Sequence, residues 1–288
     1  MPPGESVRRD LEIEEISNRW IIHPVAAWLT PRLARAGIHP NAVSLAGMGC
    51  GVLAGVAYHG YASRAHVLLG FLLMLAWHVL DGADGQLARL TGKQSPSGKV
   101  LDGICDYVTF IAVYVGLASA LQHDLGVWVW PLAVVAGICH SVQSAAYEVQ
   151  RQEYSFWGLD RASAAFTPAS AAGKNFAARL YGAYLQLQYA ASGVSPAFHA
   201  RLSRVLAADP DRGAARRQRY RETFAAPVRR WAVLSANYRT LGIFLFAYAG
   251  RPQYYSLFEI VGFSAILLLL LRSRRMRYAR FFAALDPA

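Results

Sequence analysis

Four aspartates fall at the junction of two strongly apolar segments, where they could bind a metal ion. Asp81 and Asp84 stand three residues apart. Asp102 and Asp106 stand four residues apart, so each pair would share one face of a helix. Four carboxylates at one site repel one another and are costly beside lipid unless a cation compensates them. Because hard divalent cations such as Mg²⁺ take oxygen ligands, the spacing predicts a metal site.

Small and basic residues accompany the aspartates and predict a phosphate-bearing ligand. Gly85 and Ala88 remove side-chain bulk on one helix, which leaves room for a ligand to approach the backbone. Arg89 follows directly and could clamp phosphate oxygens. Gly98, at an expected helix start, would offer free N–H groups and the positive end of the helix dipole to an anion. A metal between the two pairs of aspartates would polarise a diphosphate.

The composition indicates an integral membrane protein. Apolar residues make up 55% of the 288 positions and charged residues only 16%, which is low for a soluble protein. The formal net charge of +11 could indicate nucleic-acid binding. However, the basic residues gather between apolar segments, which is typical of membrane orientation and of contact with anionic lipid. We therefore expect membrane lipids and no nucleic acid among the partners.

We expect an all-α integral membrane protein with six transmembrane helices. The expected spans are residues 41–59, 65–90, 98–121, 127–148, 231–249 and 254–271. Asn41 would cap the first span. The second and third spans carry the aspartates, and their connection of about eight residues predicts antiparallel neighbours. Asn237 and Arg239 interrupt the fifth span, which makes it the least regular.

Two further segments are expected at the membrane surface. Residues 11–37 predict an interfacial amphipathic helix, broken near Pro24 and Pro31, although a soluble packing helix has the same pattern. Residues 151–230 form a basic, helical insertion between the fourth and fifth spans. A second interfacial helix within it would use Phe176, Leu180, Tyr184, Leu185, Leu187 and Tyr189. Its basic run, either a solvated face or a lipid-headgroup contact, is Arg212, Arg216, Arg217, Arg219 and Arg221.

The basic residues also predict orientation. Every lysine and arginine except Arg64 and Arg251 falls on one side of the six-span arrangement, and that side should be cytoplasmic. The aspartates and both termini would then face the cytoplasm, in an inner or plasma membrane. The chain would divide into a cytoplasmic N-terminus with the interfacial helix at 1–40, the first four spans at 41–150, the basic insertion at 151–230, and the last two spans with a basic C-terminus at 231–288.

The aspartates belong to a longer pattern, D-x2-D-G-x2-A-R-x8-G-x3-D-x3-D, which runs from Asp81 to Asp106. This pattern resembles, with no departure, the signature of the CDP-alcohol phosphatidyltransferase family. It fixes eight identities over 26 residues: Asp81, Asp84, Gly85, Ala88, Arg89, Gly98, Asp102 and Asp106. Asn41 and Ser44 resemble polar positions of the family at the start of the first helix.

The resemblance implies a reaction and a set of roles. The family transfers a substituted phosphate from a CDP-linked donor to a hydroxyl and releases CMP. One or two Mg²⁺ ions, with Mn²⁺ as the alternative, would be bound by Asp81, Asp84, Asp102 and Asp106. Asp106 would also be the general base. The CDP site would be formed by Asp84, Gly85, Ala88, Arg89, Gly98 and Asp102. Arg239 and, less so, Arg151 are candidates for binding the acceptor, and a homodimer is the family expectation.

The substrates stay open at this stage. CDP-diacylglycerol with a polar alcohol acceptor, such as inositol phosphate or glycerol phosphate, is the first choice. The reverse arrangement would join a CDP-choline or CDP-ethanolamine donor to a lipid alcohol. An alternative of another class is a cation transporter, which would be expected to distribute its acids through the membrane depth and to carry an inverted repeat.

Several other residues have ordinary structural interpretations. His78, one turn before Asp81, could touch the site but is expected to be a core histidine, and His140 a helix-packing residue. Glu259 stands alone in the last span and could lie near the outer interface. Gly51 and Gly55 form a small-xxx-small pair that indicates close helix packing.

Overall fold

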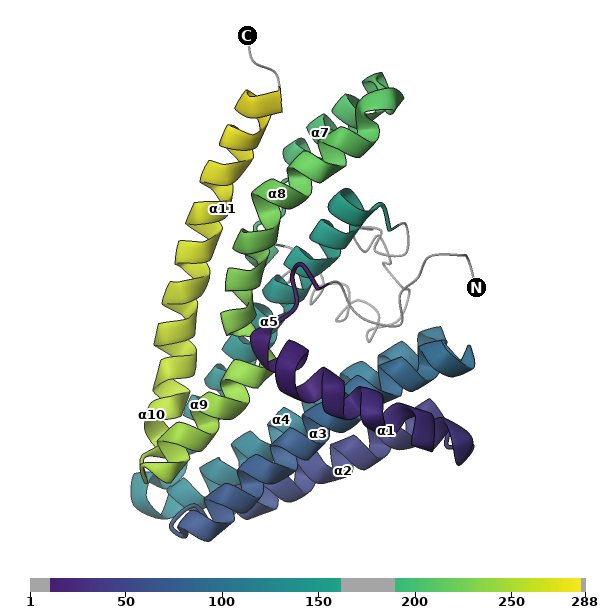
Figure 1. The fold of residues 1–288 in the computed structure, drawn as a ribbon. Helices are drawn as coiled ribbons and strands as arrows, with labels where there is room; N and C mark the ends of the chain where they lie inside the picture. The colour runs from purple at the N-terminus through teal and green to yellow at the C-terminus, as the bar shows by residue number, and fades with distance from the viewer. Residues whose placement is uncertain (1–10, 162–189, 286–288) are drawn as a thin grey trace, which may run out of the picture. The chain divides into compact units, whose positions relative to one another are not determined.

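A computed structural model of the chain describes residues 11–161 and 190–285, and every regular element in these ranges is helical (Figure 1). The all-α prediction is therefore confirmed for the described residues. The chain divides into two compact units, Met1–Ile138 with Ala236–Ile260, and Cys139–Ser235 with Val261–Ala288. The predicted second interfacial helix, between Phe176 and Tyr189, lies outside the described residues.

The first unit is organised around α2 (Pro40–His59), which packs against both α3 (Arg64–Thr91) and α4 (Pro96–Leu125). The connection between α3 and α4 is only four residues, 92–95, and begins at Gly92 with φ +66°. The two helices meet through the rings of Trp77 on α3 and Phe110 on α4, whose centroids lie 5.3 Å apart.

Glycines allow the close approach of α2 to α4. A Cβ atom on Gly51 would lie 2.3 Å from the Oγ1 of Thr109, and one on Gly55 would lie 2.4 Å from the carbonyl oxygen of Ala112. The Thr109 side chain therefore fills the space at Gly51, and the backbone of α4 itself fills the space at Gly55. The interpretation of Gly51 and Gly55 as a packing pair is confirmed.

This packing yields a stability prediction. Gly55→Ala is expected to lower the free energy of unfolding by about 1–3 kcal/mol, because the new methyl group meets rigid backbone. The matched control is Gly49→Ala on the same helix, where an added Cβ meets nothing within 4 Å. That change should be neutral or slightly stabilising. Unfolding midpoints of both variants in the same detergent check this, and equal loss in both would contradict it.

Four helical stretches of the described residues are long and apolar enough to cross a membrane: Pro40–His59, Arg64–Thr91, Ser97–Leu159 and Pro252–Ala283. They support an all-α membrane protein. The third stretch contains α4, the short turn η2 (Gly126–Trp128) and α5 (Val129–Leu159), which the sequence predicts as two spans. The predicted fifth span is not among them, since α9 (Ala236–Tyr248) has only 13 residues.

The N-terminal segment forms a π-helical turn, η1 (Asn18–Ile22), followed by α1 (His23–Arg35). The helix continues through Pro31, so the predicted break at that residue is wrong. Thr30 is buried against α3, where its hydroxyl lies 3.4 Å from the Oε1 of Gln86. Trp20 and Trp28, in contrast, are 71% and 61% exposed. The segment therefore has one face packed on α3 and one exposed face carrying tryptophan, as expected of an amphipathic helix.

The second unit contains the later part of α5, α7 (Pro196–Ala208), α8 (Gly213–Trp231) and α11 (Phe263–Leu285). Aromatic rings fill its interior, with Phe198 stacked on Tyr278 at 3.7 Å between centroids. Part of the predicted basic run holds the unit together. Arg217 pairs with Asp160 at 2.6 Å, and Arg216 donates to the carbonyl oxygen of Val205 at 2.6 Å.

Candidate active site

Three of the four motif aspartates converge at the connected ends of α3 and α4. Asp81, Asp102 and Asp106 each offer a carboxylate oxygen, and these three atoms lie within 4.8 Å of one another. All three residues are half-buried. Three carboxylates this close carry a large unfavourable repulsion that a divalent cation would relieve, and carboxylate oxygens are the ligands that hard cations prefer. The donor set therefore fits a divalent metal such as Mg²⁺.

The fourth aspartate, Asp84, is held differently. It is buried, and its Oδ2 accepts a hydrogen bond from the hydroxyl of Ser44 on α2. Asp84 does not belong to the group of three, but together with Asp81 and Asp102 it lines a small hollow. Its predicted role as a metal ligand stays a prediction.

The hollow has further walls that the sequence did not single out: Gly47, Trp77 and Cys105. Helical spacing could have found them. Gly47 lies one turn after Ser44, Trp77 lies one turn before Asp81, and Cys105 is three residues after Asp102. Gly47 has no side chain, and a Cβ atom at this position would lie 3.4 Å from the Trp77 ring. A larger residue would therefore narrow the hollow between α2 and α3.

The small and basic motif residues lie next to one another on α3, and their binding of a phosphate stays a prediction. Arg89 folds back along its own helix, so that a Cβ on Gly85 would lie 3.5 Å from its Nη1. Gly85 and Arg89 therefore present a guanidinium beside bare backbone, which suits a phosphate group. Ala88 lies between them in sequence and is half-buried.

The expectation that the N–H group of Gly98 is free is wrong. Ser95 caps α4, and its Oγ accepts the Gly98 N–H at 3.0 Å. The expected cap of the first span is also wrong, because α2 begins at Pro40 and His39 is its N-cap. Asn41 is instead near the start of α4, with its Oδ1 3.5 Å from the position of a Cβ on Gly98.

Two polar networks join α9 to the rest of the first unit. His78 is buried, as expected of a core histidine, and its Nε2 lies 2.9 Å from the Oγ1 of Thr240. Arg239 is fully buried and donates through Nη2 to the Oε1 of Glu259 at 3.1 Å. The hydroxyl of Tyr255 donates to the other oxygen of Glu259 at 2.7 Å.

These networks bear on the predicted acceptor site. Glu259 is fully buried and paired with Arg239, so the expectation that it stands alone is wrong, while its position near the outer interface stays a prediction. The guanidinium of Arg239 is engaged by Glu259, which argues against a role in holding an acceptor. Arg151 belongs to the second unit, where its Nη1 donates to Glu148 at 2.7 Å. Its role toward an acceptor stays a prediction.

The sequence profile of the CDP-alcohol phosphatidyltransferase family matches residues 37–191. The chain belongs to this family. All eight motif positions fall inside the matched region, so the resemblance stated from the motif is confirmed.

Individual relatives within the CDP-alcohol phosphatidyltransferase family match this chain over shorter regions than the family profile does. Cholinephosphotransferase 1 of Gallus gallus is 29% identical over 108 residues, which cover 35% of this chain and 32% of the relative. Phosphatidylinositol phosphate synthase of Mycobacteroides abscessus is 33% identical over 89 residues, which cover 31% of this chain and 39% of the relative. The similarity thus spans well under half the length of these curated relatives.

Proposed function

We propose that the protein is an integral-membrane phosphotransferase of phospholipid synthesis. It would move a substituted phosphate from a CDP-linked donor to the hydroxyl of an alcohol and release CMP. The observation that carries this proposal is the convergence of Asp81, Asp102 and Asp106 within 4.8 Å, at the motif positions of the family to which the chain belongs.

The motif aspartates and Ser44 would divide the chemistry among them. Asp81, Asp102 and Asp106 would hold one or two Mg²⁺ ions, or Mn²⁺, with Asp84 as the further ligand that the motif predicts. When bound, such a metal stabilises negative charge on the diphosphate and on the leaving group. Ser44 keeps the buried carboxylate of Asp84 in place through its hydrogen bond.

Asp106 is proposed as the general base. It would accept the proton of the acceptor hydroxyl, a transfer that requires hydrogen-bond reach between the two oxygens. The acceptor oxygen then forms a bond to the phosphorus distal to cytidine, and the bond from that phosphorus to the CMP oxygen breaks. Arg89, beside the bare backbone of Gly85, would contact the phosphate oxygens of the donor.

The donor proposed first is CDP-diacylglycerol, with inositol phosphate or glycerol phosphate as acceptor. The relative named phosphatidylinositol phosphate synthase supports this choice. A second candidate is a CDP-choline or CDP-ethanolamine donor with a lipid alcohol acceptor. Two relatives named cholinephosphotransferase 1, from Gallus gallus and Xenopus laevis, support that arrangement.

The proposed membrane arrangement keeps six crossings, with the aspartates and both termini on the cytoplasmic side and two chains in a homodimer. The distribution of basic residues supports the orientation. Because α9 has 13 residues and a crossing needs roughly 20, residues 231–235 would have to contribute to the fifth crossing.

The test is CMP release by the full-length protein in lipid with Mg²⁺. Each of CDP-diacylglycerol, CDP-choline and CDP-ethanolamine would be offered with a panel of alcohol acceptors. We expect CMP from one pairing, none after chelation of the metal, and recovery when Mg²⁺ is returned. If no pairing releases CMP and no CDP ligand binds the metal-loaded protein, the proposal fails. Metal-dependent cation flux without CMP would then favour a transporter.

A further inference from the structure

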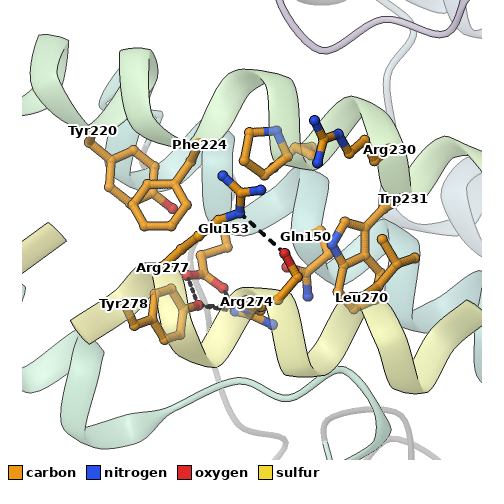
Figure 2. Close-up of a pocket in the computed structure, with 13 residues that line it drawn as sticks. Gln150, Glu153, Tyr220, Phe224, Arg230, Trp231, Leu270, Arg274, Arg277 and Tyr278 are labelled. Carbon is orange, nitrogen blue, oxygen red and sulfur yellow. Dashed lines mark hydrogen bonds and ion pairs between the residues drawn. The ribbon is translucent and has the colours of Figure 1, made fainter. Parts of the chain in front are cut away.

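A pocket of the second unit lies between α5, α8 and α11 (Figure 2). Its volume, which includes open space at the mouth, is about 430 Å³. None of its lining residues belongs to the family motif. The pocket is therefore a site of its own, and its lining shows what kind of ligand it suits.

The floor of the pocket is electrically balanced. Glu153 is buried, and its two oxygens accept from the buried Arg274 and from the hydroxyl of Tyr278 (Figure 2). Arg274 also donates to the carbonyl oxygen of Ser192. Because both oxygens of Glu153 are occupied by these partners, this carboxylate is poorly placed to compensate other positive groups of the lining.

Two further arginines give the wall an excess of positive charge. Arg230 comes from α8 and Arg277 from α11, and in Figure 2 the guanidinium of Arg277 extends toward α8. Neither forms an ion pair with any carboxylate of residues 11–161 or 190–285. Within the described part of the chain, Arg277 forms a hydrogen bond with the hydroxyl of Ser273, through Nε at 3.4 Å. Two guanidinium groups and a hydroxyl that share one pocket suit the oxygens of a phosphate group.

The sequence places this pocket at the level of lipid headgroups. The predicted fourth span ends at residue 148, and Gln150 and Glu153 line the pocket just beyond it. The apolar run of α11 ends at Leu271, and Ser273 and Arg277 follow directly.

The residues beside the pocket also indicate the level of the lipid headgroups. Leu268 and Leu269, one turn earlier on α11, are 66% and 67% exposed, as lipid-facing residues are. Trp231, a residue type enriched at membrane interfaces, forms part of the wall. Basic pockets at such positions bind anionic headgroups.

We propose that this pocket binds the phosphate group of an anionic membrane lipid, with Arg230, Arg277 and Ser273 as its donors. The acyl chains would lie along the exposed apolar face of α11. The buried Glu153–Arg274–Tyr278 network would keep the floor rigid and neutral. The site adds a lipid ligand that is neither donor nor acceptor in the proposed reaction.

The test measures lipid binding to the purified full-length protein by native mass spectrometry. The probes are phosphatidic acid, phosphatidylcholine and soluble glycerol phosphate. The variant is Arg230→Gln with Arg277→Gln. Its control is Arg229→Gln with Arg275→Gln, which removes the same charge from exposed neighbours on the same two helices that do not line the pocket.

We expect the pocket variant to bind phosphatidic acid about a hundredfold more weakly, or about tenfold for each lost charge-assisted contact. The control pair should change this affinity less than about twofold, as expected for exposed charges, and phosphatidylcholine binding should not change in either. Arg277→Lys should lose part of the affinity, because the charge remains but the planar fork does not. Circular dichroism and gel filtration verify that each variant is folded.

Equal loss of phosphatidic acid in the two double variants would overturn the proposal, since the effect would then be general surface attraction. Glycerol phosphate that binds as tightly as phosphatidic acid would also overturn it, because the ligand would then be a soluble phosphate. The measurement needs no turnover, so its outcome is independent of the reaction proposed for the aspartates.

Discussion

Asp106→Asn is expected to reduce CMP release by about a thousandfold, within the range that positioned general bases contribute. The asparagine amide cannot accept the acceptor's proton, and it removes one of the three carboxylates that lie within 4.8 Å. The fold should survive, because the change is nearly isosteric and lessens the repulsion among the remaining acids. The measurement is the single-turnover rate of CMP formation at saturating Mg²⁺.

The matched control is Asp124→Asn, which removes a carboxylate from the exposed far end of the same helix. Its rate should stay within about twofold of the parent, because exposed ion pairs contribute little. Near-normal CMP formation by the Asp106 variant would remove that residue from the role of base. Equal losses in both variants would point to damage to α4 rather than to the loss of a reacting group.

The acid site was predictable because its information is local in sequence. Asp81 and Asp84 share one face of α3, and Asp102 and Asp106 share one face of α4. Because a short connection joins the two helices, both pairs must lie at the connected ends of the helices. The structure adds what local spacing cannot contain. Ser44 reaches Asp84 across 40 positions of the chain, and its selection required the packing of α2 between α3 and α4.

Two of the wrong expectations share one physical cause, which is an unrecognised partner for a polar group. Gly98 would offer a free N–H at a bare helix start, but Ser95 supplies a hydroxyl that takes it first. Glu259 looked solitary because its partner lies 20 residues away on another helix. In both cases the sequence contained the partner, and only the fold could show which of several candidates was within reach.

The cost of breaking the Arg239–Glu259 pair should be large. Both side chains are fully buried, so Arg239→Met removes the cation that compensates Glu259, whose carboxylate also accepts from the hydroxyls of Tyr255 at 2.7 Å and Tyr114 at 3.5 Å. Breaking a buried pair from one side costs about 3–5 kcal/mol. We therefore expect a marked fall in the unfolding midpoint in detergent, with the remaining folded fraction keeping its KM for the acceptor.

A second variant separates a structural role from acceptor binding. Arg239→Met combined with Glu259→Leu removes both charges and should recover much of the lost stability, because an apolar pair can replace a buried ion pair at little cost. If Arg239 held the acceptor phosphate, its loss would instead raise the KM for a phosphorylated acceptor at least tenfold, and the double variant would not restore it. Restored stability with an unchanged KM would assign Arg239 to the packing of α9, and any acceptor-binding arginine would then have to be found elsewhere in the chain.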